Sequence, residues 1–233
     1  MPSDMKTPAA IKQWAPSREC CDAAWEEAYV RFETAEEEIR KFVSRLRSFG
    51  ADQWDTNLSM VELFCGRGGG LDAWQRLGFS NLEGVDISAS LLHRYGGKAQ
   101  LYLGDCRCLQ LPDASRDIIC VQGGLHHLPV LPADLISTVS EVARVLRPGG
   151  RFIVVEPWST PFLTIVHAMI RQRVLRRIWG KLDALACMIE REHETYFNWL
   201  SRPAEILKVL EQPFQTVTKR AAWGKLCWLG RKR

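Results

Sequence analysis

The sequence predicts an α/β fold in which a doubly wound, seven-stranded and mostly parallel sheet is covered by helices on both faces. Between residues 58 and 156, five short apolar segments alternate with helical segments, which indicates right-handed βαβ crossovers. Two further strand candidates, 214–220 and 225–232, are separated by only four residues, a spacing typical of an antiparallel hairpin. The length of 233 residues suits one large domain or two small ones.

The first 57 residues are expected to form a helical cap of two helices. Apolar residues recur at helical spacing from Trp25 onward. Thr34 then opens a capping box with Glu37, which predicts the start of the second helix. This helix has one apolar face and ends near Gly50. Because each helix has a single apolar stripe, both are expected to pack on the rest of the protein.

The predicted core is followed by a helical lid and a closing hairpin. After Pro157 no strand signal appears before residue 214, so we expect a helical lid over 157–211 and a β-hairpin within 212–233. The five predicted core strands are 60–64, 81–87, 100–105, 117–122 and 151–157, and helices are predicted near 70–77, 88–92 and 135–146.

The formal net charge of +4 is distributed unevenly. Residues 1–57 carry 8 basic and 11 acidic side chains, 58–156 carry 9 and 10, and 157–233 carry 14 and 6, so these regions have net charges of −3, −1 and +8. Such asymmetry indicates that the last third presents a surface with its own partner. The overall composition, 46% hydrophobic and 25% charged, excludes disordered and collagen-like classes.

The chain shows no targeting or metal-binding motif. No stretch approaches the ~20 apolar residues needed to span a bilayer, and the N-terminus lacks the apolar segment of a secretory signal. A cytoplasmic protein with reduced cysteines is therefore expected. Cys106 and Cys108 are separated by one residue, a spacing unlike that of zinc sites, so the eight cysteines predict no metal site and are expected to be small buried residues.

Residues that carry chemistry gather at the carboxyl ends of the first predicted strands, where open α/β sheets bind ligands. The first strand leads into ELFCGRGGG, residues 62–70, whose glycines let the backbone approach a ligand closely. The second strand ends in Asp86, 18 residues after Gly68, where an acid can accept hydrogen bonds from ribose hydroxyls. The third strand ends in Asp105.

With these motifs the chain resembles the class I S-adenosylmethionine-dependent methyltransferases, and especially the small-molecule group that includes ubiquinone/menaquinone-biosynthesis enzymes. LHHL at 125–128 and EVARVLRPGG at 141–150 match the second half of that group's pattern. The resemblance implies one domain, 1–233, whose sheet ends in an antiparallel strand. It also implies S-adenosyl-L-methionine as cofactor, bound by Glu62, Phe64, Gly66, Gly68, Asp86, Ile87, Asp105, Cys106 and Gln122.

One residue departs from the group's pattern. Phe64 stands two residues after Glu62, where the group has glycine. The turn can survive because Gly66 and Gly68 keep the closest backbone approaches. Charge considerations predict that Glu62 orients the amino end of the cofactor, and a loop-capping carboxylate is the alternative.

Three other functions share part of this pattern. The FCGRGG segment is also similar to the opening motif of DNA cytosine methyltransferases, but their Pro-Cys pair is absent from the sequence. An NAD-linked oxidoreductase shares the glycine-rich turn and the ribose acid, yet it does not explain LHHL or the closing hairpin. A non-enzymatic binding module that keeps the fold and docks a partner through its basic lid stays as the alternative, with Phe64 as its only support.

His126 and His127 are the candidate catalytic residues, because they follow the fourth strand beside the expected position of the methyl group. An imidazole there can accept a proton near neutral pH. Packing and hydrogen bonding of the loop are the alternative role. The candidate substrate-binding residues are Tyr29, Glu156, Trp158 and Tyr196, with Trp25 and Trp199 as further aromatic walls, and core packing is the alternative for these aromatic residues.

Basic and apolar residues interleave over 165–182 without an acidic residue. This pattern predicts a basic amphipathic helix that can lie on an anionic membrane or contact a phosphate-bearing substrate. A solvated basic face over a lid is the alternative, and no nucleic acid partner is expected because no nucleic-acid-binding module is recognised.

The sequence therefore predicts methyl transfer to a small molecule, either lipophilic or phosphate-bearing, in the cytoplasm or at the membrane periphery.

Overall fold

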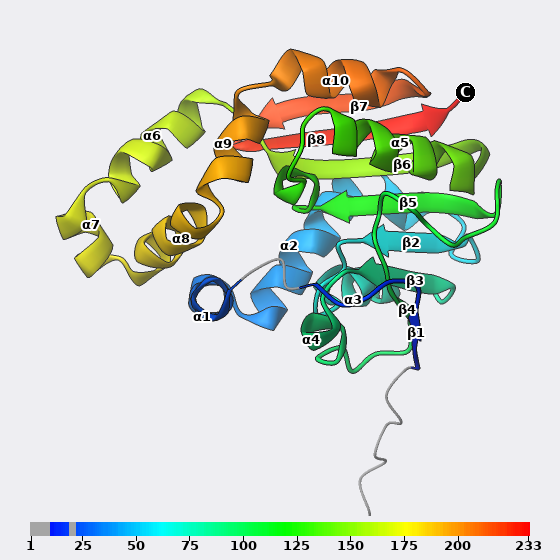
Figure 1. The fold of residues 1–233 in the computed structure, drawn as a ribbon, viewed down its shortest axis with the longest axis horizontal. Coiled ribbons are helices and arrows are strands. Elements are labelled where there is room, and N and C mark those ends of the chain that lie inside the picture. The colour runs from blue at the N-terminus through cyan, green and yellow to red at the C-terminus, as the bar shows by residue number, and fades with distance from the viewer. Residues whose placement is uncertain (1–9, 19–21) are drawn as a thin grey trace, which may run out of the picture.

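An eight-stranded sheet forms the centre of the protein in a computed structural model that describes residues 10–18 and 22–233 (Figure 1). The strand order is β1-β4-β3-β2-β5-β6-β8-β7. β8 runs antiparallel to both of its neighbours, β6 and β7, whereas the other neighbouring strands pair in parallel. The strands are β1 Ile11–Gln13, β2 Met60–Leu63, β3 Leu82–Asp86, β4 Gln100–Leu103, β5 Arg116–Gln122, β6 Leu146–Pro157, β7 Phe214–Ala222 and β8 Lys225–Lys232.

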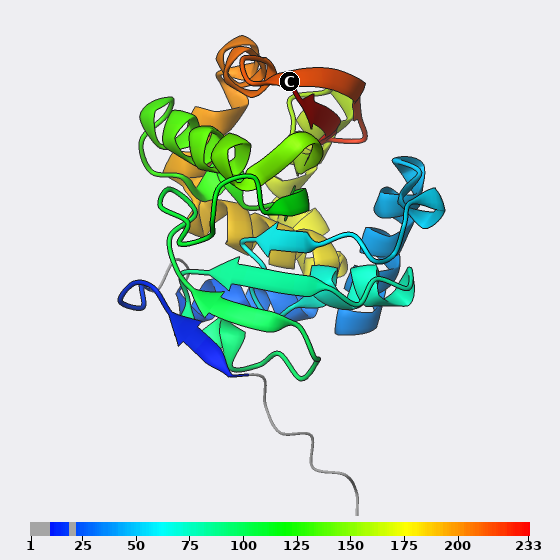
Figure 2. The ribbon, with the colours of Figure 1, turned by 90° about the vertical axis from the view of Figure 1, so that its right-hand side faces the viewer.

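Helices cover both faces of the sheet and extend beyond its carboxyl edge (Figures 1 and 2). None of the helices in the described ranges is long and apolar enough to cross a bilayer. The α-helices are α1 Ala23–Phe32, α2 Ala35–Ser48, α3 Gly69–Arg76, α4 Ala89–Leu92, α5 Ala133–Val145, α6 Pro161–Ile170, α7 Arg173–Ile178, α8 Gly180–Arg191, α9 His193–Leu200 and α10 Pro203–Glu211, with 3-10 turns η1 Ala51–Gln53 and η2 Leu125–His127.

The five core strands and the closing hairpin are confirmed, but the predicted number of seven strands is wrong. The eighth strand, β1, pairs in parallel with β4 at the edge of the sheet, in the register Ile11 to Leu101. Trp14 continues this contact, since its backbone N–H donates to the Leu103 carbonyl at 2.8 Å. The sequence of β1 is only IKQ, and two of its residues are exposed, so it lacks the alternating pattern that reveals a strand.

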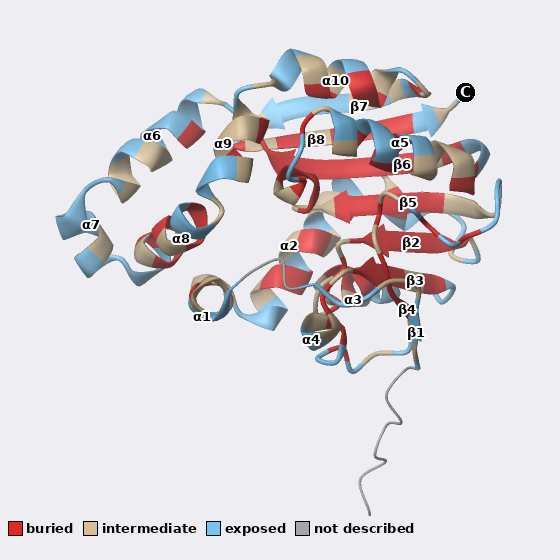
Figure 3. Ribbon diagram, viewed as in Figure 1, coloured by how far each residue is buried: buried red, intermediate tan, exposed pale blue. Residues whose placement is uncertain are grey.

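The core lies on both faces of the sheet (Figure 3). In β2, Val61 and Leu63 belong to the cluster under α5, α9 and α10, whereas Met60 belongs to the cluster under α2 and α3. This alternation follows from the two-residue period of a strand. All four residues of β2 are buried. The carboxylate of Glu62 therefore lies inside the face covered by α2 and α3.

The sheet changes winding direction beside β2. From β2 the chain proceeds to β3 and β4 on one side, whereas β5 and β6 lie on the other. Such a reversal opens a crevice at the carboxyl ends of the strands. The loops after β2 and β5 leave the sheet at this point, so the fold itself fixes where a ligand can enter.

The two N-terminal helices form as predicted. The hydroxyl of Thr34 accepts a hydrogen bond from the Glu37 backbone at 3.2 Å, and the Glu37 carboxylate accepts one from the Thr34 backbone at 3.0 Å, which confirms the capping box. The helix α1 packs against α8 through Ala28, Ala184 and Met188. This contact joins the N-terminal cap to the lid.

The predicted single helix over 165–182 is wrong, because this segment is divided among α6, α7 and α8. Gln172 and Trp179 have extended backbone conformations, with ψ of 105° and 94°. These two breaks turn the chain back, so that α8 lies beside α1 while α7 lies at the tip of the lid (Figure 1). The burial of the apolar face of α8 against α1 favours this turn over a continuous helix.

Two of the lid's basic side chains form ion pairs with acidic residues. Arg176 forms ion pairs with Asp183 and Glu190, and Lys181 pairs with Glu37. The other three basic residues of the predicted helix, Arg171, Arg173 and Arg177, are exposed. The basic surface is therefore smaller than the sequence alone indicates.

The Asp117→Asn substitution is expected to destabilise the sheet by about 1–2 kcal/mol. The Asp117 carboxylate accepts hydrogen bonds from the backbone and hydroxyl of Ser59 at 2.9 and 2.7 Å and pairs with Arg147 at 2.6 Å. Burial alone would raise its pKa, but these contacts outweigh burial and hold the pKa below its ordinary value.

A lowered pKa means that the ionised carboxylate stabilises the fold at neutral pH and that this contribution is lost as pH falls through the lowered pKa. Urea unfolding of the wild type and the Asp117→Asn variant at several pH values measures the difference. An equal free energy of unfolding at neutral pH would contradict the prediction.

Candidate active site

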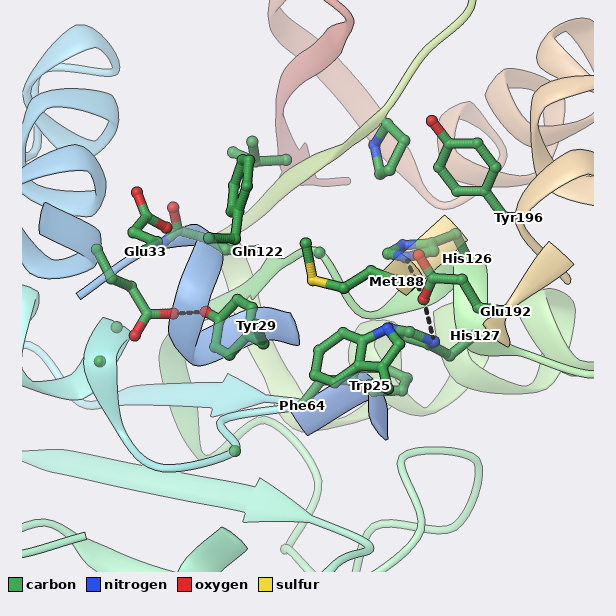
Figure 4. A pocket seen from close by; sticks show the side chains of 18 of the residues that line it. Trp25, Tyr29, Glu33, Phe64, Gln122, His126, His127, Met188, Glu192 and Tyr196 are labelled. Atoms are coloured by element: carbon green, nitrogen blue, oxygen red, sulfur yellow. Dashed lines mark hydrogen bonds and ion pairs between the residues drawn. The ribbon is translucent and has the colours of Figure 1, made fainter. Parts of the chain in front are cut away.

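A cavity of about 840 Å³ opens at the carboxyl ends of the strands, between the sheet, the N-terminal helices and the lid. It brings together residues from β2, β3, β5, α1 and α8, which are far apart in the sequence (Figure 4). The predicted site residues that line it are Tyr29, Glu62, Phe64, Gly66, Asp86, Ile87, Asp105, Cys106, Gln122, His126, His127 and Tyr196.

The remaining predicted site residues do not line this cavity. Gly68 adopts a φ of 87°, and a Cβ at this position would lie 2.1 Å from the Tyr95 ring, so its glycine is required by the turn and by packing. Glu156 is 0% exposed, and Trp158 lies in the hydrophobic core beneath the lid. Neither side chain therefore reaches the cavity wall, where a substrate-binding residue is expected. Of the two further aromatic candidates, Trp25 lines the cavity and Trp199 is buried in the core.

Asp86 ties the loop after β2 to the end of β3. Its carboxylate accepts hydrogen bonds from the backbone of Gly66 at 2.8 Å and of Ser88 at 2.9 Å. Burial nevertheless raises its pKa. A Cβ at Gly66 would meet nothing nearer than 3.9 Å, so the backbone here faces open space in the cavity. A ligand can thus reach both the Asp86 carboxylate and the loop.

Glu62 and Gln122 place unpaired polar atoms at the winding reversal of the sheet. Among the described residues, one carboxylate oxygen of Glu62 and both amide atoms of Gln122 are buried without a hydrogen-bond partner. Burial, together with the nearby carboxylate of Glu38, raises the pKa of Glu62 well above its ordinary value. Unpaired buried groups are costly. A cationic or hydrogen-bonding ligand group would satisfy them.

Phe64 stands where the methyltransferase group that the sequence resembles has glycine, and the structure accommodates its ring. Its φ of 57° is in the left-handed region, which is costly for a bulky residue. Its ring lies against Gly124, where a Cβ would come within 2.2 Å of the Phe64 ring. The missing side chain of Gly124 thus makes room for the extra ring of Phe64. This removes the reason to regard Phe64 as support for a non-enzymatic module.

Asp105 is already engaged by a residue that the sequence reasoning missed. Arg107 donates to both of its oxygens at 2.6–3.1 Å and also pairs with Asp134 at 2.8 Å. The hydrogen bonds from Arg107 lower the pKa of Asp105. Trp14 lies next to Gly104, where a Cβ would come within 2.7 Å of its ring. The Asp105 carboxylate therefore lines the cavity in a fixed position, because both of its oxygens already accept hydrogen bonds from Arg107.

His126 and His127 lie together on η2 at the opposite end of the cavity, with ring centroids 4.1 Å apart (Figure 4). Nδ1 of His126 lies 2.7 Å from a carboxylate oxygen of Glu156. Because a carboxylate only accepts, Nδ1 carries the hydrogen. Glu192 completes the group, with one oxygen 3.3 Å from Nδ1 of His127 and 3.7 Å from Nε2 of His126.

The two histidines differ in protonation. Burial lowers the pKa of His126, but the hydrogen bond and charge of Glu156, together with Glu192, outweigh burial and raise it to about 9. Burial and the neighbouring charge of His126 lower the pKa of His127 to about 4. In the free protein at neutral pH, His126 is therefore charged and His127 is neutral.

Glu192 is the main residue of this group that sequence reasoning did not find. It lies between α8 and α9, far along the chain from the histidines. No local motif marks it, since an acidic residue at the end of an exposed helix is ordinary. Only the packing of the lid over the sheet brings it to the histidine pair.

The comparisons with known proteins agree with this geometry. Residues 61–154 match the profile of a family described as a methyltransferase domain. A ubiquinone/menaquinone biosynthesis C-methyltransferase from Geobacter sulfurreducens is 28% identical over 161 residues, which cover 60% of this chain and 57% of that protein. A fatty-acid O-methyltransferase from Mycolicibacterium smegmatis is 25% identical over 205 residues, covering 78% of this chain and 73% of that protein.

The fold comparison extends the similarity over nearly the whole chain. The crystal structure of a putative S-adenosylmethionine-dependent methyltransferase from Methanococcus maripaludis superposes with a TM-score of 0.58 at 13% identity, covering 94% of this chain and 96% of that one. The methyltransferase fold and the resemblance to class I S-adenosylmethionine-dependent methyltransferases are thereby confirmed. The family model and the relatives are named as methyltransferases, and the superposed structure is named as S-adenosylmethionine-dependent. The chain spans little more than half the length of the first of these relatives.

The Gly70→Ala substitution is expected to destabilise the protein by about 1–3 kcal/mol, because the new Cβ would lie 1.8 Å from a carboxylate oxygen of Glu62. The Gly96→Ala variant is the matched control, since a Cβ there meets nothing within 4 Å. Thermal unfolding measures both. Adding Glu62→Ala to Gly70→Ala should recover part of the lost stability, and equal unfolding temperatures for the two single variants would contradict the prediction.

Proposed function

We propose that this protein transfers a methyl group from S-adenosyl-L-methionine to a small-molecule acceptor. The observation that carries the proposal is the single cavity whose one end holds Asp86 and the glycine loop and whose other end holds the histidine pair. In-line methyl transfer needs a cofactor and an acceptor in one enclosed space. The methyltransferase family match and the named relatives support the same reaction.

The cofactor end suits the proposed ligand in its charges and unpaired atoms. Asp86 would accept hydrogen bonds from the ribose hydroxyls, and Ile87, Asp105 and Cys106, which also line the cavity, would hold the adenine. Glu62 and Gln122 hold buried polar atoms without partners among the described residues, which suits the charged end of the methionine part. When bound, S-adenosyl-L-methionine supplies an electrophilic methyl group that an acceptor electron pair takes up as the carbon–sulfur bond breaks and its electrons stay on sulfur.

The acceptor end is largely apolar and aromatic, which supports a lipophilic acceptor. Trp25, Tyr29, Phe64, Met188 and Tyr196 surround the space in front of the histidines (Figure 4). Such walls exclude water from the reacting atoms and bind apolar groups. The two curated relatives are named for quinone and fatty-acid methylation, and lipophilic acceptors of that kind match this lining.

We propose that His126 and His127 contact the acceptor, as the sequence predicts. The ring of His126 is fixed by Glu156, and that of His127 packs edge-on against Trp25 with centroids 6.1 Å apart. Both rings line the cavity. Their fixed orientation suits residues that position an acceptor atom.

The Asp86→Asn substitution is expected to weaken S-adenosyl-L-methionine binding roughly 10- to 100-fold, since a hydrogen bond to a charged group contributes about 1.5–3 kcal/mol. Isothermal titration calorimetry measures this affinity. The exposed Asp52→Asn variant is the control, and thermal unfolding separates loss of binding from loss of folding. If the wild-type protein does not bind S-adenosyl-L-methionine, methyl transfer is excluded and a non-enzymatic module is favoured.

The mouth of the cavity supports peripheral contact with an anionic membrane. Phe162, Ile165, Trp179 and Trp223 are exposed and also line the cavity, and Ile178 is exposed next to Trp179 in the chain. Trp223 and Ile178 are 77% and 78% exposed. Interfacial docking combines exposed apolar groups with basic residues, which Arg171, Arg173 and Arg177 supply. The apolar rim consists of Phe162, Ile165, Ile178, Trp179 and Trp223.

Flotation with vesicles rich in anionic lipid is expected to recover the protein, with binding that weakens as salt rises. Replacing Ile178 and Trp179 by serine should weaken binding roughly tenfold or more, because a buried large apolar side chain contributes about 1.5–3 kcal/mol. The matched control is Val217→Ser on β7, where the side chain is 58% exposed outside the cavity. Absence of salt-sensitive binding would refute membrane contact and leave methyl transfer untouched.

A further inference from the structure

We propose that His126, His127 and Glu192 form a binding site for a divalent transition-metal ion such as Zn²⁺. One atom from each residue, Nε2, Nδ1 and Oε2 respectively, takes part, and all three atoms lie within 4.8 Å of one another. The carboxylate oxygen is 3.3 Å from one nitrogen and 3.7 Å from the other. Ligands bonded to a tetrahedral zinc ion at about 2.1 Å lie about 3.4 Å apart. The two distances from the carboxylate oxygen are therefore close to the spacing that a metal requires. Figure 4 shows the three side chains next to one another.

The donor set matches that of metal sites that keep a position open. Two imidazoles and one carboxylate hold the zinc ion of several hydrolytic enzymes, whereas structural zinc sites are closed by a fourth protein ligand. All three residues line the cavity. In the described part of the chain, no other group of three histidine, cysteine or carboxylate side chains converges in this way. An exchangeable ligand can therefore reach the ion from the cavity.

A second carboxylate orients the first ligand. Glu156 accepts the hydrogen bond from Nδ1 of His126 at 2.7 Å, which leaves Nε2 directed toward Glu192. Glu156 is itself fixed by the backbone N–H groups of Gly124 and Leu125, each at 2.8 Å. Metal-binding histidines commonly donate their other ring N–H to such a carboxylate, which fixes the tautomer and the ring orientation.

Glu192 has an unsatisfied atom at the centre of this arrangement. Its Oε2 is buried and, within 10–18 and 22–233, accepts no hydrogen bond. A buried carboxylate oxygen that accepts no hydrogen bond costs free energy, even where ionic contacts compensate in part. The same oxygen is the one that faces both histidines. A divalent ion would satisfy it and would balance the charges of two neighbouring buried carboxylates, Glu156 and Glu192.

An ion with one open coordination position could bind the methyl acceptor, and this role rests on the proposed methyl transfer. An ion held by these three cavity-lining residues would be reached from the cavity, so an oxygen or nitrogen atom of the acceptor could complete its coordination. A metal-bound hydroxyl or carboxylate is held in its anionic form more readily than a free one. The acceptor is then a lipophilic molecule with a metal-ligating polar group, and the metal site itself does not depend on the cofactor.

The test is equilibrium dialysis of the full chain against Zn²⁺ after treatment with a chelator, at mildly alkaline pH, where protons compete least for the histidines. We expect one Zn²⁺ per chain. The Glu192→Gln variant, which keeps the side chain's shape, and the His127→Ala variant should each lower the affinity at least tenfold. The matched control is Glu190→Gln, two residues before Glu192 near the end of α8, whose side chain is 59% exposed and which should bind like the wild type.

Binding of Co²⁺ in place of Zn²⁺ provides an independent readout, because its visible absorption reports a low coordination number with nitrogen and oxygen ligands. The proposal is overturned if the wild type binds no metal, or if Glu192→Gln binds it as tightly as the wild type. Calorimetry with S-adenosyl-L-methionine is run on the same samples. Metal binding without cofactor binding would refute methyl transfer alone, and the reverse result would refute the metal site alone.

Discussion

The buried carboxylate of Glu156 is the group on which the acceptor end of the cavity depends. It lies at the end of β6 and takes hydrogen bonds from two backbone N–H groups and from His126. An unpaired carboxylate at this depth would cost several kcal/mol. Although burial raises its pKa, these donors outweigh burial and lower it. The loop after β5 is consequently held against β6, and both histidines are presented to the cavity in fixed orientations.

At the proposed cofactor end of the cavity, a second buried carboxylate is left incompletely paired. Glu62 lies just as deep, yet one of its oxygens has no partner within the described residues, and its pKa is raised. The fully paired carboxylate of Glu156 fixes the loop after β5 against β6. The incompletely paired carboxylate of Glu62 can still accept a hydrogen bond from a ligand. Binding sites commonly hold such perturbed groups, because function requires interactions that folding leaves open.

Two compensations allow this chain to depart from the common pattern of its fold. The bulk of Phe64 in a left-handed conformation is matched by the absence of a side chain at Gly124. The apolar face of the lid helix α8 is covered by α1, which packs on it and closes the cavity from the N-terminal side. Because α1 and α8 lie outside the segment that matches the family model, they are the walls of the cavity in which this chain can differ most from similar proteins.

By itself the sequence determined the core strands, the capping box at Thr34 and the acid at Asp86, because each depends on periodicity or on spacing within a few residues. It did not determine β1, whose three residues join the sheet only through pairing with β4. Nor did it determine the breaks in the lid or the inward position of Glu192. Tertiary structure decided these features, since contacts between distant segments depend on how all the apolar faces of the chain are buried together, and local sequence carries little information about that sum.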